Sequence, residues 1–487
     1  MITEPAVQRF EIDRAGIAEP AGRVARFLAS RAAAEPRVAI MAGNTAEFVI
    51  AREAVTALGR VAVPVNSKLA PPEVAFVLAD ARPSVVLCTD ALEPVAHAAI
   101  GDLPDKSAAP SIVSIADAAR TPGPPVPLRD AIGATLIYTS GTTGYPKGCF
   151  RSDAQEAARA AELTGTYGLS AADVHLIACP LAHSAPGIFL RAAMAAGART
   201  VVMSRFRPEA FLDAVAETRA SFFFLVPTQY ERLLALPETA RHARDTSSIR
   251  CAIVAGAPIA PATKQRLVDW LGDGVLWEFY GSSETGTVAV LPPAAQLTRP
   301  ASVGQPPPGV DVRLVDEDGQ PGPPGTVGEI YVRSPTVMQG YLAADGSIAR
   351  PAGAVPGFVS VGDLGRLDDD GYLYLVDRKH DTIISGGVNV YPAEVERVVA
   401  AHPDVAGAVC FGKPDPDWGQ IVALVVAPRE PVDAATFAQE LRSWLRPRVA
   451  AFKIPKAIAV IPASELPIGS SGKPLRRRAR SRRLAFH

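Results

Sequence analysis

Residues 138–148 read Tyr-Thr-Ser-Gly-Thr-Thr-Gly-Tyr-Pro-Lys-Gly, and they follow directly on the apolar run of residues 134–137. A turn rich in glycine and hydroxyl groups, with one lysine, offers backbone N–H groups, hydroxyl donors and a movable ammonium group to a polyphosphate. The string differs from the Walker A pattern, because Gly-x-x-x-x-Gly-Lys-Ser/Thr cannot be aligned to it. We therefore predict a phosphate-binding loop here, with a plain Ser/Thr/Gly surface loop as the alternative.

The segments on both sides of this loop alternate between helical patterns and short apolar runs. Residues 44–60 and 70–83 have the spacing of amphipathic helices, and residues 61–66 and 84–90 are strand-like. The same rhythm returns after the loop and continues to the strand-like residues 275–279. Alternation of this kind predicts an α/β fold with parallel-rich sheets and helices packed on them.

The character of the chain changes near residue 300. Glycine and proline turn signals become frequent there between short alternating strands, which predicts an antiparallel β region. From residue 391, the pattern of a helix, two strands, a helix and a strand predicts a small α+β unit of about one hundred residues. We place the boundary near Arg378 to Asp381 and expect two domains, residues 1–378 and 379–487.

The composition excludes several classes of protein. The length of 487 residues allows roughly two to four domains, and 48% hydrophobic with 20% charged residues is typical of folded proteins. A net charge of −1 gives no overall field that would attract nucleic acid, and no apolar run approaches the ~20 residues of a membrane helix. Five dispersed cysteines without a C-x-x-C motif indicate neither a disulfide framework nor a zinc site. Without a signal-peptide pattern at the N-terminus, we expect a cytoplasmic protein.

Further short motifs come after the loop along the chain. They are Pro180-Leu181-Ala182-His183, Gly256-Ala257-Pro258, Tyr280-Gly281-Ser282-Ser283-Glu284-Thr285, Gly362-Asp363, Asp377-Arg378, Ser385-Gly386-Gly387 and Gly472-Lys473. Together with the loop, they resemble the motifs of the adenylate-forming superfamily, which includes acyl-CoA synthetases, nonribosomal adenylation domains and firefly luciferase. The resemblance covers most of the chain, and it implies a large N-terminal AMP-binding domain with a β-barrel-like subdomain, and a small mobile C-terminal domain.

The resemblance implies an ATP-dependent carboxylic acid–CoA ligase of the fatty-acid or aryl-acid type. Such an enzyme uses ATP, Mg²⁺ and CoA; it forms acyl-AMP and pyrophosphate, and then transfers the acyl group to the CoA thiol. A stand-alone adenylation enzyme that loads a carrier protein, a luciferase-type oxygenase and a non-catalytic nucleotide-binding protein remain as alternatives. The expected partners are small molecules, with neither nucleic acid nor an integral membrane location, and a homodimer is an open alternative to a monomer.

The resemblance assigns the nucleotide site to the loop and to the motifs after residue 250. The residues that would bind ATP or AMP are Thr139, Ser140, Gly141, Thr142, Thr143, Gly144, Lys147, Gly256, Ala257, Pro258, Tyr280, Gly281, Ser282, Ser283, Asp363, Arg378 and Lys473. Tyr280 would stack on adenine, Asp363 would accept both ribose hydroxyls, and Arg378 would add a second ribose contact. Glu284 suits Mg²⁺, because this ion is bound through carboxylate and phosphate oxygens; a solvated loop carboxylate is the alternative.

Lys473 is expected to be the catalytic lysine. Only nine of the 49 basic residues are lysines, and this one stands in a Gly/Ser loop just before an arginine-rich run. By resemblance, its ammonium group would stabilise the negative charge that develops when the carboxylate attacks the α-phosphate. We interpret the arginine run, residues 476–483, as a solvated tail, with a patch for nucleic acid or anionic membranes as the alternative.

The remaining site residues also follow from the resemblance. The acyl pocket is assigned to His183, Pro186, Phe189, Tyr230 and Gly281, the CoA channel to Gly386 and Gly387, and the hinge to His380; His183 is also a candidate catalytic residue. No arginine is placed by a motif to pair with a second carboxylate, so a largely apolar monocarboxylic acid is expected.

The chain departs from the family pattern at several positions. Asp153 stands where a histidine is usual, Ala182 replaces an aromatic residue, and His380 replaces an aspartate or lysine. Because a missing ring leaves room, Ala182 favours a larger acyl group. A histidine titrates near neutrality, so His380 could make domain closure sensitive to pH.

Overall fold

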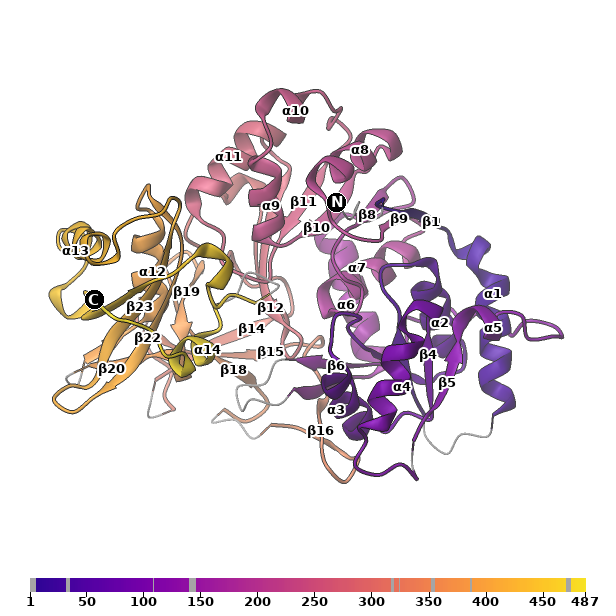
Figure 1. The fold of residues 1–487 in the computed structure, drawn as a ribbon. Helices are drawn as coiled ribbons and strands as arrows, with labels where there is room; N and C mark the ends of the chain where they lie inside the picture. Colours follow the sequence, from indigo (N-terminus) through magenta and orange to yellow (C-terminus); the bar gives the residue numbers. More distant parts are fainter. Residues whose placement is uncertain are drawn as a thin grey trace.

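The computed structural model describes residues 6–31, 36–107, 109–139, 146–316, 319–323, 325–351, 355–385, 388–469 and 474–487; for His380, Val388 and Asn389 it describes the backbone alone. The strands of this part of the chain form four sheets. Figure 1 shows the C-terminal residues as a separate body beside the larger N-terminal region.

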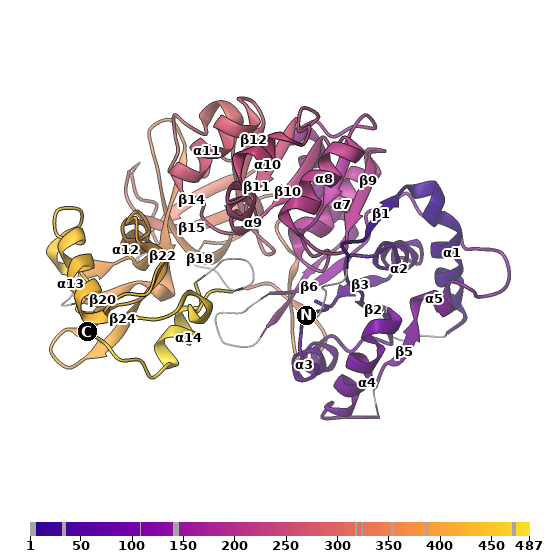
Figure 2. The ribbon, with the colours of Figure 1, turned by 45° about the horizontal axis from the view of Figure 1, so that its top comes forward.

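Two parallel-rich sheets make up most of the N-terminal region (Figures 1 and 2). The first has the strand order β1 (Arg9–Ile12), β9 (Arg199–Met203), β8 (Val174–Ile177), β10 (Phe222–Leu225), β11 (Cys251–Val254), β12 (Leu276–Ser282) and β13 (Gly286–Leu291). Its five inner strands are parallel, and β1 and β13 are antiparallel to their neighbours. The second has the order β17 (Ile348–Ala349), β16 (Gly340–Leu342), β7 (Lys147–Arg151), β6 (Thr135–Thr139), β3 (Val61–Pro64), β2 (Arg37–Met41), β4 (Val85–Cys88) and β5 (Ser111–Ser114). In it, β6 to β5 are parallel, and β17, β16, β7 and β6 pair antiparallel.

Helices cover the faces of both sheets. In chain order they are α1 (Arg14–Ser30), α2 (Ala46–Ala57), α3 (Pro71–Ala81), η1 (Asp90–Leu92), α4 (Glu93–Gly101), α5 (Ile115–Ala118), α6 (Asp153–Tyr167), α7 (Ser184–Ala195), α8 (Pro208–Thr218), α9 (Pro227–Leu234), α10 (Glu238–His242), α11 (Pro261–Leu271) and η2 (Pro293–Ala295). Along β2, Val38 and Ile40 join a core cluster with α1, α2 and α7, whereas Ala39 and Met41 join a cluster with α3 and α4. This two-residue alternation of a strand buried on both faces explains its continuous apolar sequence.

An antiparallel sheet follows the two large sheets. Its order is β14 (Asp311–Val315), β15 (Gly328–Arg333), β18 (Val359–Leu367) and β19 (Leu373–Arg378). Single bridges join Gln305 to Val290 of β13 and Gly304 to Leu373 of β19, so this sheet continues from the edge of the first one. The subdomain expected to resemble a β-barrel therefore contains a four-stranded antiparallel sheet that adjoins β13.

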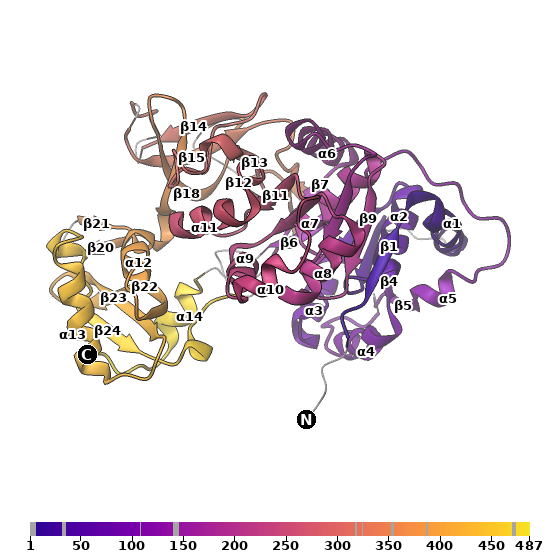
Figure 3. The same cartoon turned by 90° about the horizontal axis from the view of Figure 1, so that it is seen from above.

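The C-terminal body is built on a five-stranded sheet. Its order is β21 (Val388–Val390), β20 (Ile383–Ser385), β23 (Gly419–Pro428) and β22 (Val405–Asp415), and β24 (Ala457–Val460) pairs with β23. Helices α12 (Pro392–Ala400) and α13 (Ala434–Leu445) cover one face, and α14 (Arg476–Ser481) packs on the other through Ala479. Short 3-10 helices lie at η3 (Lys379–Asp381), η4 (Ala451–Lys453) and η5 (Ala463–Glu465). In Figure 3 this body lies beside the antiparallel sheet and α11.

The predicted α/β class is confirmed, including the helix–strand–strand–helix–strand order of the C-terminal body. All five cysteines are buried and free, so the structure contains no disulfide. Within the described ranges, no helix has both the length and the apolar character needed to cross a lipid bilayer.

Candidate active site

The carboxyl ends of neighbouring parallel strands bring several sequence motifs together. Chain segments that leave β8, β10 and β11 carry residues 178–183, Val226 and residues 255–258, and the end of β12 carries Tyr280 to Ser282. In open α/β sheets, ligands bind at this edge, outside the carboxyl ends of the strands. The fold therefore places the predicted acyl and adenosine motifs along one edge of the first sheet.

A buried asparagine holds the segment after β8 in place. The side-chain amide of Asn44 donates to the carbonyls of Cys179 and Met203 at 2.9 and 3.1 Å, and its Oδ1 accepts from the Leu181 N–H at 2.9 Å. Because Asn44 is 7% exposed, these bonds are shielded from water. Asn44 thus fixes the loop that ends at His183. No motif in the sequence marks Asn44 as a residue of the site.

The turn between β12 and β13 presents the predicted magnesium ligand. The Ser282 hydroxyl accepts from the N–H groups of Glu284 and Thr285, both at 3.1 Å, which closes a tight turn. At Gly281 an added Cβ would lie 2.1 Å from the carbonyl oxygen of Gly286, so only glycine fits where the two strands approach. The turn is thereby held in a shape that directs Glu284 toward the second sheet.

The Glu284 carboxylate joins the two sheets at the predicted phosphate site. Its Oε1 accepts from Thr139 Oγ1 at 3.0 Å and from the Tyr341 hydroxyl at 3.1 Å. Lys147 Nζ lies 5.4 Å from the centre of the Tyr341 ring. Of the two described ends of the phosphate loop, Thr139 therefore lies beside Glu284 and Lys147 lies near the ring of Tyr341. Ser140, Gly141, Thr142, Thr143 and Gly144 lie outside the described residues.

The Glu284 site fits Mg²⁺ in its chemistry. Mg²⁺ is commonly held by one or two carboxylates together with substrate phosphates and water. Glu284 is 8% exposed and lies next to the phosphate loop. No group of three or more metal-binding side chains occurs among the residues that the structure describes. The ion would therefore be held by Glu284 together with the phosphates of ATP.

The predicted adenosine residues form a connected group. The Tyr280 hydroxyl donates to Asp363 Oδ2 at 2.6 Å, and Arg378 Nε donates to Asp363 Oδ1 at 3.1 Å. Asp363 and Arg378 are register partners on β18 and β19, so the antiparallel ladder fixes their spacing. Burial raises the pKa of Tyr280 well above its usual value, and the Asp363 carboxylate adds to this effect. The phenol therefore remains a hydrogen-bond donor at neutral pH.

The predicted acyl-pocket residues divide into two sets. His183 is exposed just before the first turn of α7, Pro186 is buried in that helix, and Gly281 lies where β12 and β13 approach closely. Val226, which was not predicted, lies 3.5 Å from the position of a Cβ at Gly256, whose φ is +92°. Phe189 and Tyr230 are instead fully buried: Phe189 stacks on Phe224, and the Tyr230 hydroxyl donates to the Ile253 carbonyl at 3.0 Å. The structure therefore places these two rings in the core behind the strand ends.

His183 lies in an environment that disfavours its charged form. Surrounding protein atoms desolvate the ring, and the nearby ammonium group of Lys68 repels an imidazolium, so the pKa of His183 is lowered. Lys68 itself is exposed. At pH 7 the imidazole is therefore neutral, with one nitrogen able to donate and the other able to accept a hydrogen bond.

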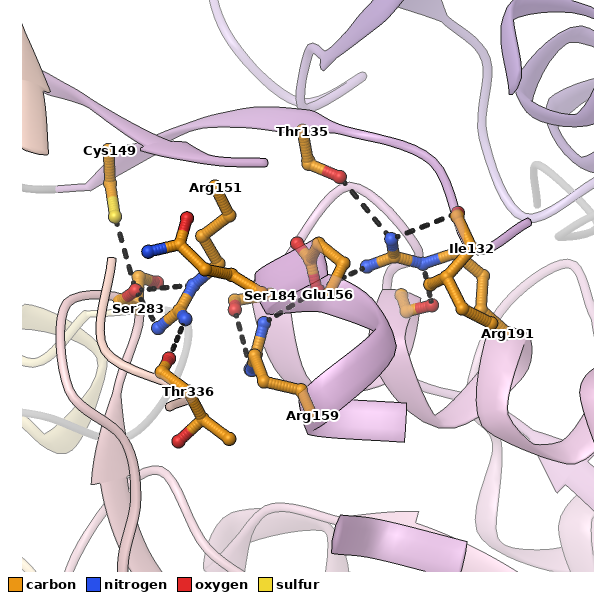
Figure 4. A network of polar contacts seen from close by, with 12 residues as sticks. Ile132, Thr135, Cys149, Arg151, Glu156, Arg159, Ser184, Arg191, Ser283 and Thr336 are labelled. Atoms are coloured by element: carbon orange, nitrogen blue, oxygen red, sulfur yellow. Dashed lines mark hydrogen bonds and ion pairs between the residues drawn. The ribbon is translucent and has the colours of Figure 1, made fainter. Parts of the chain in front are cut away.

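A buried polar network supports the site from behind (Figure 4). Arg151, at the end of β7, donates through Nε to the Ser283 carbonyl at 3.0 Å and also contacts the Thr336 carbonyl, and the Cys149 thiol donates to the same Ser283 oxygen at 3.1 Å. Burial lowers the pKa of Arg151 to about 10, so it stays charged at neutral pH. This guanidinium fixes the residue that precedes Glu284.

The network continues through α6 to the start of the phosphate-loop strand. Glu156 is fully buried between Arg159 and Arg191, each at 3.2 Å, and Arg159 reaches Ser184 Oγ at 3.2 Å while Arg191 reaches Thr135 Oγ1 at 3.3 Å. Burial alone would raise the pKa of Glu156, but the two guanidinium groups outweigh it and lower this pKa to about 2. The phosphate-loop strand, α6 and α7 are thus linked by charges that no sequence motif marks.

Asp153 starts α6 and ties it to the preceding chain. Its Oδ1 accepts from the Gly133 N–H at 2.6 Å, while Ser152 and Gln155 form a capping box at the same helix end. The residue that replaces the usual histidine therefore holds the segment before β6.

The structure describes little of the residues predicted to act in the C-terminal part of the chain. Lys473, Gly386 and Gly387 lie outside the described residues, and the side chain of the expected hinge residue His380 does too. Its backbone lies in η3, where Lys379 Nζ forms an ion pair with Glu329 Oε2 of β15 at 2.9 Å. The roles of these four residues stay predictions.

Comparisons with known proteins agree with this arrangement. The AMP-binding enzyme family matches residues 15–342, and the AMP-binding enzyme C-terminal domain matches residues 394–473. A feruloyl-CoA synthase of Amycolatopsis sp. is 35% identical over 96% of this chain and 93% of its own length, and an indoleacetate–CoA ligase of Aromatoleum aromaticum is 34% identical over 94% and 91%. The o-succinylbenzoate-CoA synthetase of Bacillus subtilis, solved with its acyl-adenylate intermediate, has a TM-score of 0.82 at 30% identity and covers 96% of this chain and 92% of its own.

Proposed function

The chain belongs to the AMP-binding enzyme family, and from this premise we propose that the acid it joins to CoA is an aromatic carboxylic acid. It is an ATP-dependent acid–CoA ligase, AMP-forming, that uses ATP, Mg²⁺ and CoA. Acyl-AMP and pyrophosphate form first, and the acyl group then passes to the CoA thiol. The identity of the acid is the part that we propose.

The observation that carries the proposal is the small, apolar character of the strand ends near His183. Ala182, Val226 and Gly256 bring no long or charged side chain to this edge, and Ala182 stands where the family usually has an aromatic ring. A planar ring of the substrate would occupy this space, because apolar pockets favour occupants that fill them. Three relatives act on feruloyl, indoleacetate and succinylbenzoate groups, each of which contains an aromatic ring.

The described polar residues suit the nucleotide of the first half-reaction. We assign Thr139, Lys147 and Glu284 to the phosphates, with Mg²⁺ at Glu284, where the ion would neutralise phosphate charge. Tyr280, Asp363 and Arg378 would hold the adenosine, with Asp363 exchanging its bond from Tyr280 for the ribose hydroxyls. Holding the two reactants in line at the α-phosphate removes much of the entropic barrier to attack.

The C-terminal residues complete the proposal. Lys473 would stabilise charge at the α-phosphate during adenylation, and Gly386 and Gly387 would line the channel for the CoA thiol. A rotation about His380, between domains 1–378 and 379–487, would exchange the two, because pyrophosphate must leave before the thiol enters. A homodimeric state and a cytoplasmic location also stay predictions, which sedimentation and cell fractionation would test.

A panel of acids tests the substrate class. AMP release is measured with benzoic, cinnamic, ferulic and indoleacetic acids and with straight-chain acids of about 4, 8 and 16 carbons, each with and without CoA. We expect kcat/KM for the best aromatic acid to exceed that for any straight-chain acid by about tenfold or more, the usual discrimination of a fitted apolar pocket. A straight-chain acid that exceeds every aromatic acid would contradict the proposal. A carrier protein replaces CoA in a parallel assay; we expect CoA to be the faster acceptor.

A further inference from the structure

One residue of the C-terminal arginine run turns inward instead of facing solvent. Arg476 begins α14, and its side chain is 10% exposed. Its Nε donates to the Cys410 carbonyl at 3.1 Å, one terminal nitrogen contacts Asp381 Oδ2 at 3.2 Å, and the other contacts Glu396 Oε2 at 2.7 Å. The neighbouring Arg477 and Arg478 are exposed. The solvated-tail interpretation is therefore wrong for Arg476.

The three partners of Arg476 come from three different elements. Asp381 closes the 3-10 helix η3, Glu396 lies in α12, and Cys410 lies in β22. Glu396 also accepts from the Cys410 N–H at 2.8 Å, which holds its carboxylate in place. One guanidinium group therefore ties the start of α14 to the expected hinge segment and to the core of the C-terminal body.

The hinge segment is anchored at its other end as well. Asp377, the next-to-last residue of β19, accepts from the Arg378 N–H at 2.7 Å and from the Ala393 N–H of α12 at 2.6 Å. Burial alone would lower the pKa of Arg476, but the carboxyl groups of Glu396, Asp377 and Asp381 outweigh it and raise this pKa. A guanidinium fork among buried carboxylates is a rigid, directional contact.

Arg476 follows Lys473 by three residues along the chain. Three residues of extended chain span at most about 11 Å, so the contacts of Arg476 anchor the chain shortly after Lys473. We propose that Arg476 is a positioning residue for Lys473, because it holds the start of α14 and the hinge segment as one unit during adenylation. This inference rests on the proposed function, in which Lys473 acts in the first half-reaction and is withdrawn in the second.

Measuring the two half-reactions separately distinguishes a positioning role of Arg476 from a general structural role. In Arg476→Gln we expect acid-dependent ATP–pyrophosphate exchange to fall by about 10- to 100-fold, since a misplacement of about 1 Å costs on the order of 100-fold. Thioester formation from synthetic acyl-AMP and CoA should stay within about threefold, because Lys473 takes no part in it. Arg477→Gln, on the exposed side of the same helix, is the matched control and should change neither rate.

Arg476→Lys provides a second, milder variant in case Arg476→Gln does not fold. A lysine keeps the charge but cannot fork between Asp381 and Glu396, so we expect the same selective loss of exchange at a smaller size. Thermal unfolding of each variant is measured alongside the rates. An equal fall of both half-reactions, or no fall in either, would overturn the positioning role.

A double variant shows whether Arg476 acts through Lys473. In a Lys473→Ala background, Arg476→Gln should cause no further loss of exchange, because residues that act as one unit are not additive. A multiplicative loss would overturn the inference. If Lys473→Ala alone exchanged at the wild-type rate, the proposed function of Lys473 would fail instead, which is a distinguishable result.

Discussion

Ala182 is the residue at which this chain has a methyl group where the family usually has an aromatic ring beside the expected acyl group. It is 9% exposed and stands directly before His183, on the segment that Asn44 holds in place. A methyl group in place of a ring removes the wall that a family member with an aromatic residue would have there. Acid preference should therefore depend on this position.

Replacing Ala182 by phenylalanine should restore that wall and shift the preference toward small acids. We expect kcat/KM for indoleacetic or ferulic acid to fall by about tenfold or more relative to benzoic acid, because steric filling of an apolar pocket costs about this much per step in size. Competition between the acids for one enzyme sample measures the ratio directly. An unchanged ratio in a variant with wild-type thermal stability would show that Ala182 does not face the acid.

Lys68 and His183 provide a second prediction at this scale. Because Lys68 is one of the two causes that lower the pKa of His183, Lys68→Met should raise this pKa while desolvation still keeps it below about 6.5. The titration of the His183 ring protons by NMR measures the change, with His183→Gln used for assignment. Lys106→Met, a change at another exposed lysine, should leave the His183 titration in place.

The proximity of side chains was predictable from the sequence where a motif marks them. Glu284, Thr139, Tyr280, Asp363 and Arg378 form the expected groups. Asn44, Arg151 and Glu156 were not predicted, because a buried polar group acts through partners that lie far away in the chain. Arginines are numerous in this chain, and no local sequence pattern distinguishes the buried arginines from the exposed ones. Phe189 and Tyr230 were predicted to line the acyl pocket, but both side chains are buried in the core. A motif shows which segment lies near the site, but it does not show which side chains of that segment point into the core.

At the scale of single elements, helix α6 carries a carboxylate that is buried between two guanidinium groups. Its Glu156 is fully buried, while its first residue, Asp153, and its capping box join it to the strands on either side of the phosphate loop. Buried carboxylates of this kind contribute stability only while they are ionised. The helix should therefore respond to acid.

Acidification should weaken the fold through Glu156. Its pKa of about 2 in the folded protein lies below the ordinary value of 4.5, so its contribution is present above pH 4.5 and is lost as pH falls from about 4.5 toward 2. Glu156→Gln should be less stable by about 3–5 kcal/mol at pH 7, because two guanidinium groups lose their partner. It should lose less additional stability than wild type between pH 6 and pH 3, as measured by urea unfolding.

Glu238→Gln, a change at an exposed glutamate of α10, serves as the control for this experiment. It should follow the wild-type pH dependence. If Glu156→Gln lost as much stability on acidification as wild type, another group would be responsible for the acid response.

Elements were predicted well where the hydrophobic period is clear. The expected helix at residues 44–60 is α2, Ala46–Ala57, and the strand-like residues 61–66 are β3, Val61–Pro64. Strand β7, Lys147–Arg151, was not predicted as a strand, because its sequence has a lysine, a glycine and a buried arginine among its five residues. Its pairing with β6 and β16 forms it; the β6 partners lie 8 to 16 positions away in the chain, but the β16 partners lie about 190 positions away.

At the scale of the whole molecule, the chain passes once from the N-terminal sheets to the C-terminal body, through η3. Lys379 pairs with Glu329 on one side of this passage, and Asp381 pairs with Arg476 on the other. The backbone of the expected hinge residue His380 thus lies between Lys379, which contacts the N-terminal region, and Asp381, which contacts the C-terminal body. The relative position of the two parts was not predictable from the sequence, because the pattern of a single chain does not encode how its parts sit against each other.

The expected hinge residue His380 predicts that the balance between the half-reactions is sensitive to pH. Histidine as a residue type responds to pH near neutrality, whereas lysine stays charged throughout. In His380→Lys, we therefore expect the ratio of adenylation to thioester formation to become flat near neutral pH. Stopped-flow rates of both steps at several pH values measure it, and superimposable profiles for the two proteins would contradict the prediction.

The burial of all five cysteines has a consequence for the chemistry of the intermediate. Burial raises the pKa of Cys149, which lies beside Ser283, to about 12, and it raises those of Cys88, Cys179 and Cys251 to between about 11 and 12 and that of Cys410 well above its usual value. A thiol attacks an activated acyl group as its thiolate, and these side chains remain protonated. The five buried cysteine thiols are therefore poor nucleophiles toward a mixed anhydride, and among thiols the incoming thiol of CoA has the advantage.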